Sequence, residues 1–137
     1  MSKGIIPDAA TRWARYRIGY HLVWIPKYRR PLLTEEVRQT VMASLATACA
    51  EHDLTLLACE TDLDHVHVFV SARPAVSPAD VARLLKGASS RAVRRAHPKV
   101  AARSGPRGLW AQSYYVGTVG DMSAETVRHY IENCQGQ

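Results

Sequence analysis

Two kinds of hydrophobic period follow one another along this chain, and their order limits the folds open to it. Apolar residues occupy every second position in 16–24, a spacing typical of a strand with one apolar face. The period then changes to three or four residues, which predicts a helix that is capped by Thr34 and continues to about His52. The chain therefore begins with a strand followed by a helix.

The middle of the chain repeats this pattern with one more strand. Residues 54–60 and 65–71 are predicted strands, separated by a short turn at 62–64. A second helical period starts at Pro78, which suits the first turn of a helix, and ends before Pro98.

A fourth strand is predicted over 109–119, and a last helix over 123–135. The order is β-α-β-β-α-β plus one helix, which predicts an α+β fold of the ferredoxin-like, or RRM-like, kind with an antiparallel sheet. The length of 137 residues suits one domain. We expect an N-terminal arm over 1–14, a core over 15–122 and the final helix.

Composition excludes several classes of protein. With 47% hydrophobic and 22% charged residues, the chain suits a soluble globular domain, not a disordered tail or a fibre. No apolar run approaches the roughly 20 residues of a membrane span, and the first residues show no apolar leader segment. The three cysteines form no CxxC pair and are expected to be reduced thiols of a cytoplasmic protein. No GxxxxGK[ST] loop occurs, which is consistent with a protein that uses no nucleotide cofactor.

The positive charge is concentrated in one segment. Residues 78–107 hold eight Lys and Arg against one Asp, a net charge of +7, while the whole chain carries +6. Such a patch favours a polyanionic partner, although a solvated helix face explains it equally well. The residues expected to contact such a partner here are Arg83, Lys86, Arg91 and Arg94.

A second basic group lies between the first strand and the first helix. Lys27, Arg29 and Arg30 surround Tyr28, a combination that suits phosphate contact and base stacking. A charged turn without a ligand is the alternative interpretation.

Two histidines share one face of the third strand. Because side chains alternate along a strand, His65 and His67 lie on the face opposite the valines between and after them. Two adjacent imidazoles are half of a divalent metal site, or simply two hydrogen-bonded histidines. Asp62 and Asp64 lie next to the pair and suit metal ligation, orientation of the imidazoles or turn chemistry. His21, on the mixed face of the first strand, is a candidate DNA contact or a partner of a neighbour.

Tyr130 lies at the edge of the apolar stripe of the last helix. A phenol in that position is either a nucleophile towards a metal-polarised phosphate or a ring that packs at the edge of the core.

Several blocks of sequence together resemble the single-tyrosine HUH transposases of the insertion-sequence 200/605 type, over about residues 16–135. The blocks are YHLVW at 20–24, KYRR at 27–30, DHVH at 64–67, Trp110 with YYVGTVG at 114–120, and YIEN at 130–133. The resemblance implies a dimeric, Mg²⁺- or Mn²⁺-dependent enzyme that cuts and rejoins single-stranded DNA at element ends bearing subterminal hairpins. It also implies that His65 and His67 hold the metal and that Tyr130 forms a 5′-phosphotyrosine intermediate.

One position departs from that family's pattern. The family places a third metal ligand, usually Gln, four residues after the tyrosine, where this chain has Cys134. Gln135 is one residue further on, about 140° around a regular helix from Tyr130. The expected third ligand is Gln135, with Cys134 and Asn133 as alternatives and Asp62 as a nearby acidic group.

Two other functions stay open at this stage. One is a catalytically impaired or domesticated relative, which the cysteine at position 134 would suit. The other is a nucleic-acid-binding module without catalysis, in which the histidines are structural. The expected location is the cytoplasm of a prokaryote, with action on the nucleoid.

Overall fold

The structure is a computed structural model, and it describes residues 6–106 and 108–119. The expected helix at 123–135 therefore lies outside the described residues, and so do Tyr130, Asn133, Cys134 and Gln135.

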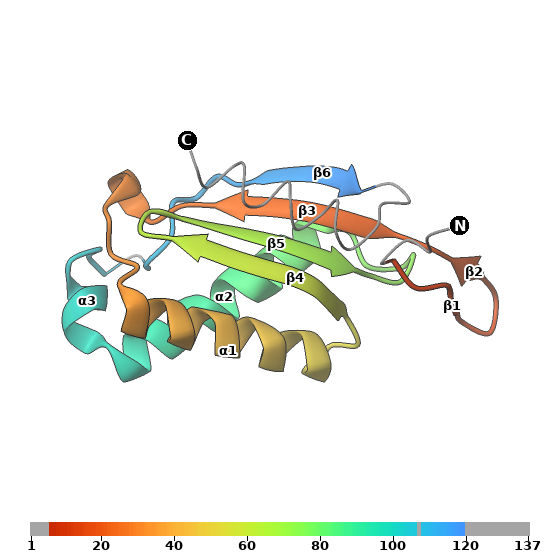
Figure 1. Ribbon diagram of the computed structural model, residues 1–137, viewed down its shortest axis with the longest axis horizontal. Coiled ribbons are helices and arrows are strands. Elements are labelled where there is room, and N and C mark those ends of the chain that lie inside the picture. Colours follow the sequence, from red (N-terminus) through yellow and green to blue (C-terminus); the bar gives the residue numbers. More distant parts are fainter. Residues whose placement is uncertain (1–5, 107, 120–137) are drawn as a thin grey trace.

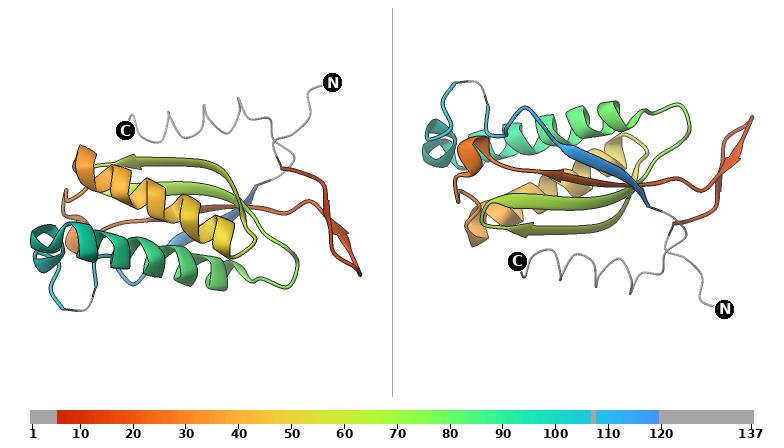
Figure 2. Two further views of the ribbon diagram at one scale, coloured as in Figure 1. Left: turned by 90° about the horizontal axis from the view of Figure 1, so that it is seen from below. Right: turned by 90° about the horizontal axis from the view of Figure 1, so that it is seen from above.

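An antiparallel sheet of four strands forms the centre of the described fold, with the spatial order β4-β5-β3-β6 (Figure 1). Two long helices, α1 and α2, lie together on one face of this sheet (Figure 2). The ferredoxin-like α+β fold is therefore confirmed. The strands are β3 (Gly19–Trp24), β4 (Thr55–Asp62), β5 (His65–Ser71) and β6 (Tyr115–Val119), and the helices are α1 (Glu35–Glu51), α2 (Pro78–Ala96) and the short α3 (Pro98–Ala102).

The ends of the long helices follow from local chemistry. The extended backbone of Thr34 precedes α1, and two acidic residues occupy its first turn, where the helix dipole favours them. Ser77 caps α2, because its hydroxyl accepts a hydrogen bond from Asp80 N at 3.0 Å. Pro98 cannot continue α2, which ends at Ala96.

The core lies between the sheet and the helices. It is mostly aliphatic, but α2 also buries Ser89, a residue that a hydrophobic period does not predict. The Ser89 hydroxyl donates to the carbonyl of Leu85 and accepts from Trp110 Nε1 at 3.0 Å. Both bonding capacities of the hydroxyl are used, so its burial leaves no unsatisfied polar group.

The N-terminal segment differs from the expected arm. Ala9–Ala10 (β1) pairs with Arg15–Tyr16 (β2) in a small antiparallel ribbon, and the first strand of the main sheet begins only at Gly19. The alternation at 16–24 thus spans two different strands. Alanines have low strand propensity, so the ribbon depends on its turn and is not visible as a hydrophobic period.

The last described strand is shorter than expected. Pairing with β3 starts at Tyr115, and residue Trp110 forms only an isolated bridge with Pro26. Between them, the carbonyls of Ala111 and Gln112 accept hydrogen bonds from Lys86 Nζ at 2.6 and 3.2 Å. These carbonyls point to a side chain of α2, so the segment does not join the sheet.

Within the part of the chain that the structure describes, no helix has the length and hydropathy that a membrane crossing requires.

Candidate metal centre and nucleic-acid interface

The two histidines of β5 lie side by side on the sheet face opposite α1 and α2. Val66, Val68 and Val70 enter the core beneath the helices, as the alternation predicts. The ring centroids of His65 and His67 are 4.8 Å apart, with the ring planes nearly perpendicular. The sequence pattern therefore placed this pair on the correct face.

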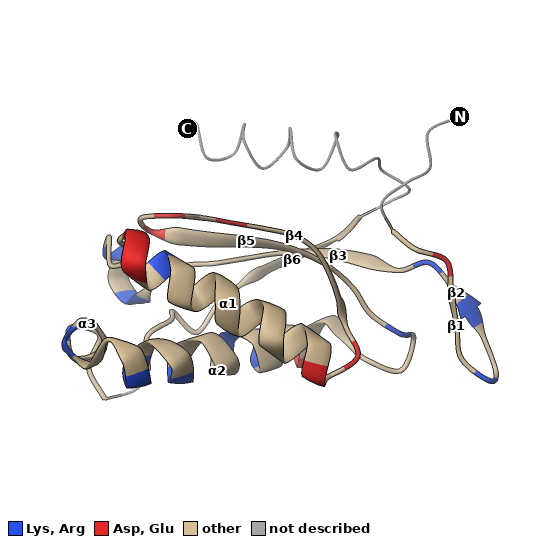
Figure 3. Ribbon diagram, turned by 60° about the horizontal axis from the view of Figure 1, so that its bottom comes forward, with Lys and Arg blue, Asp and Glu red and all other residues tan. Residues whose placement is uncertain are grey.

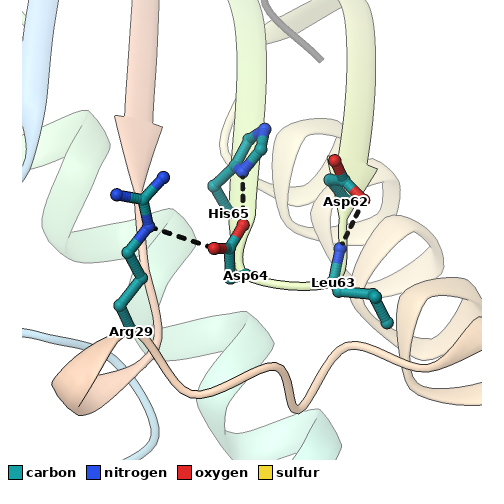
Figure 4. Close-up of polar contacts among 5 residues, drawn as sticks. All are labelled: Arg29, Asp62, Leu63, Asp64 and His65. Atoms are coloured by element: carbon teal, nitrogen blue, oxygen red, sulfur yellow. Dashed lines mark hydrogen bonds and ion pairs between the residues drawn. The ribbon is translucent and has the colours of Figure 1, made fainter. Parts of the chain in front are cut away.

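An aspartate and an arginine fix the orientation of His65 (Figure 4). Nδ1 of His65 donates to Asp64 Oδ1 at 2.8 Å, and Arg29 Nε donates to Asp64 Oδ2 at 3.0 Å. The hydrogen bond from His65, together with Arg29, lowers the pKa of Asp64, so this carboxylate is ionised and can only accept. The ring nitrogen that remains for a ligand is Nε2.

His67 is held by a second imidazole. His67 Nδ1 lies 3.3 Å from Nε2 of His21, and the two rings are stacked. Burial lowers the pKa of His21 and of His67 to about 4, and the neighbouring rings add to the effect at His67. Both imidazoles are thus neutral near pH 7, and the tautomer in which His67 Nδ1 donates leaves its Nε2 lone pair for a cation.

His21 lies below the surface and not on it. Its ring stacks on Phe69 at 4.4 Å with parallel planes, Tyr115 meets its edge, and the residue is only 6% exposed. This position suits a partner of His67 better than a direct contact with DNA.

The donor set fits two ligands of a divalent cation. Two imidazoles are available, and the charge of nearby Asp62 acts on His67, while Asp62 Oδ1 accepts from Leu63 N at 2.8 Å. Among the described residues, no cluster of three or more His, Cys, Asp or Glu side chains is arranged to hold a metal ion. The expected further ligand at 133–135 lies outside the described residues.

The basic turn after β3 is a short 3-10 helix, η1 (Lys27–Arg29), with an unusual backbone. Tyr28 and Arg29 both have positive φ, 59° and 51°, a region that costs free energy for residues other than glycine. Tyr28 is 82% exposed beneath the guanidinium of Arg30, whereas Arg29 reaches Asp64. The turn therefore presents one aromatic ring to solvent and connects to His65 through Arg29.

The basic residues of α2 have different surroundings. Figure 3 shows Lys and Arg along α2 and α3. Helix α2 packs on the valine face of β5, which is opposite the face of the histidines. Arg91 and Arg94 are exposed, and Arg83 is exposed but ion-paired with Asp80. Lys86 is half-buried, its pKa is lowered by burial, and its ammonium holds the 111–112 carbonyls. Arg91 also lines a shallow groove of about 550 Å³ between α1 and α2.

Sequence reasoning missed two features of this region. It offered orientation of the imidazoles as one role for Asp64, which the contact with His65 bears out, but did not pair Asp64 with Arg29. It offered partnership with a neighbour as one role for His21 but did not name His67 as the partner. The alternation of β3 and β5 was the available signal for the second pair, because His21 and His67 lie on the same sheet face.

Comparison with known proteins identifies similar sequences along nearly the whole chain. Residues 14–134 match the family model described as "Transposase IS200 like". The ISDra2 transposase TnpA of Deinococcus radiodurans is 34% identical over 118 residues, which are 86% of this chain and 84% of that protein. The transposase for insertion sequence element IS200 of Salmonella typhimurium is 32% identical over 125 residues, 91% of this chain and 80% of that protein.

Solved structures show the same fold. A crystal structure of a Deinococcus radiodurans protein assigned as a transposase has 34% identity and a TM-score of 0.75, and covers 93% of this chain and 97% of that one. A REP-associated tyrosine transposase bound to a REP hairpin has 13% identity and a TM-score of 0.58. This match covers 90% of this chain and 69% of that one.

Proposed function

The chain belongs to the IS200-like transposases of mobile elements, and on this basis we propose that it cuts and rejoins single-stranded DNA at hairpin-bearing element ends through a metal-dependent phosphotyrosine intermediate. The enzyme acts as a homodimer in this proposal, and Mg²⁺ or Mn²⁺ is its cofactor.

One observation carries the proposal: both histidines of β5 have their Nδ1 atoms occupied. Asp64 accepts from Nδ1 of His65, and His21 faces Nδ1 of His67. Each ring is thereby oriented with Nε2 as the remaining donor, which is the arrangement of metal-ligating histidines with an outer partner. Two merely structural histidines would not require the same nitrogen to remain open on both rings.

Tyr130 is the proposed nucleophile. Its phenolic oxygen forms an ester bond to the scissile phosphorus, the bond from phosphorus to the 3′ oxygen breaks, and the leaving 3′ oxygen takes up a proton. A 3′-hydroxyl of another strand end reverses the exchange and releases the tyrosine. Phosphoester bonds are conserved in both steps, so no nucleotide is consumed.

His65 and His67 would hold the cation, with Gln135 as the proposed further ligand. When bound, such a cation polarises the scissile phosphate and stabilises the charge that develops on it. The chain itself supplies a neutral imidazole at His67, because burial keeps this ring deprotonated near pH 7.

The test of this function is a denaturing gel with Mn²⁺ and labelled single strands that tile the DNA flanking the gene. We expect a covalent protein–DNA band that disappears when EDTA removes the metal. Tight hairpin binding without any such band would contradict the proposal and favour a binding module or an impaired relative.

Basic residues of α2 are the proposed hairpin surface. Arg91 and Arg94 are exposed on adjacent turns, and a fold relative has been solved with a REP hairpin bound. We expect the double change Arg91→Ala, Arg94→Ala to weaken hairpin binding. The slope of the logarithm of the binding constant against the logarithm of the salt concentration should become less steep by about 0.9 for each lost phosphate contact. Binding isotherms between low and moderate salt measure this.

Arg73→Ala is the matched control for the single changes Arg91→Ala and Arg94→Ala, because it also removes one positive charge, from a loop where Arg73 pairs with Asp53. An equal loss of affinity in this control would mean that α2 has no special role and that only net charge matters.

Cys134 gives a specific reason to consider an impaired enzyme, because a soft thiol is a poor ligand for Mg²⁺. We expect Gln135→Ala to weaken Mn²⁺ binding by about tenfold or more and Cys134→Ala to leave it nearly unchanged. Calorimetric titration of the two variants decides between them. A reversed result would make Cys134 the ligand, and equal affinities would mean that neither residue binds the metal.

A further inference from the structure

The tip of the β1–β2 ribbon carries the most exposed aromatic side chain of the described residues. All three tryptophans of the chain are described, and Trp24 and Trp110 are 1% and 6% exposed, whereas Trp13 is 84% exposed. A tryptophan is normally buried over most of its surface, so this placement requires a reason.

The turn that presents Trp13 is ordered by its own hydrogen bonds. Thr11 N donates to the carbonyl of Ala14 at 2.7 Å and closes the turn. The Thr11 hydroxyl accepts from the backbone N–H groups of Trp13 and Ala14, at 3.3 and 3.1 Å. The ring is thus held out by a defined turn and not by a loose end.

The ribbon is also fixed to the main sheet. Arg17 donates to Asp8 through Nε and Nη2, at 2.9 and 2.7 Å, and joins the two ends of the ribbon. Ile6 is buried against Phe69 and Val119 on the histidine face. Gly19 leaves room for it, because a Cβ at position 19 would lie 2.7 Å from Ile6 Cδ1. Figure 1 shows the ribbon projecting from the end of the sheet opposite η1.

The chemistry around Trp13 selects one class of ligand. The guanidinium carbon of Arg12 lies 4.9 Å from the centroid of the Trp13 ring, and Arg15 is exposed nearby. The acid of the ribbon, Asp8, is engaged by Arg17. Arginine stacked on an exposed indole, with further positive charge beside it, matches an unpaired nucleobase with its phosphates. An apolar protein surface or a lipid tail would not require Arg12 and Arg15 beside the ring.

We propose that Trp13 stacks on an unpaired base of the single-stranded substrate, while Arg12 and Arg15 bind the flanking phosphates. This inference rests on the proposed action on single strands and adds a binding site to it. The six residues of β3 span about 20 Å, and the histidines face its far end. The Trp13 site therefore contacts nucleotides some distance from the scissile phosphate and extends the length of strand that the protein holds.

Intrinsic fluorescence tests this directly, because the two other tryptophans are buried. EDTA is added to exclude cleavage. An oligo-dT strand is then expected to quench the fluorescence of Trp13, which is the part of the tryptophan emission that acrylamide can also quench. A fully paired duplex of the same length is expected to quench it much less, since its bases are already stacked. Trp13→Ala is expected to weaken oligo-dT binding by about tenfold or more, measured by fluorescence anisotropy of a labelled strand.

Trp13→Phe is the matched variant: it removes the exposed indole emission but keeps a ring for stacking, and it is expected to restore most of the affinity. Unchanged oligo-dT affinity in Trp13→Ala overturns the proposal. A change in the sedimentation of Trp13→Ala without a change in oligo-dT affinity also overturns it, and would assign Trp13 to a contact between copies of the chain.

Failure of this inference leaves the covalent band of the cleavage assay in place. Failure of the proposed function removes that band while quenching by oligo-dT persists.

Discussion

Replacing Tyr130 by phenylalanine is expected to abolish the covalent protein–DNA product while hairpin binding stays within about twofold of wild type. Phenylalanine keeps the ring but lacks the oxygen that forms the ester with the phosphorus, so no substitute nucleophile is present in the same position. A denaturing gel measures the covalent product, and a native gel shift with the same oligonucleotide measures binding.

Tyr114→Phe is the control for this experiment, because Tyr114 is a partly exposed tyrosine just before β6. It should form the covalent product at the wild-type rate. A covalent band that persists in Tyr130→Phe would show that another residue is the nucleophile, and peptide mapping of the labelled adduct would then identify it.

The second large effect is expected from His67→Ala. Loss of this proposed ligand should reduce the proposed Mn²⁺-dependent cleavage by more than the 10- to 100-fold that loss of an outer partner of a ligand costs. The variant also loses the imidazole that His21 faces at 3.3 Å. Single-turnover cleavage and calorimetric Mn²⁺ titration measure the two consequences separately.

His52→Ala is the matched control, because His52 is an exposed histidine at the end of α1, away from the sheet face of β5. It should retain both the rate and the metal affinity of the wild type. Wild-type Mn²⁺ binding and cleavage in His67→Ala would mean that the histidines of β5 are structural.

The fold was predictable wherever local pattern and tertiary structure agree. Alternation gave the bounds of β5 correctly, and Pro78 and Pro98 marked the ends of α2. The ribbon at 9–16 and the late start of β6 were not predictable, because they depend on a turn closed by Thr11 and on Lys86 reaching carbonyls 25 and 26 residues away. A hydrophobic period in the sequence carries no information about hydrogen bonds of this kind.

The candidate site, like the fold, was predictable from the sequence only in part. The strand period placed both histidines on one face, but it carried no information about Arg29, which lies 35 residues from Asp64 in sequence. That ion pair depends on two residues with positive φ, Tyr28 and Arg29, a backbone that their side chains do not favour. The exposure of Trp13 was not predictable for a related reason. The sequence shows that a tryptophan is present but not that a turn exposes it.

The position of β5 in the sheet has a consequence for local unfolding. β5 is bonded to β4 on one side and to β3 on the other, whereas β6 pairs with β3 alone within the described residues. Strands bonded on both sides open only in large cooperative units, and their amides exchange with solvent last. The backbone that carries both histidines should therefore keep its geometry while the sheet edges fray, and the proposed cation site would keep its shape with it.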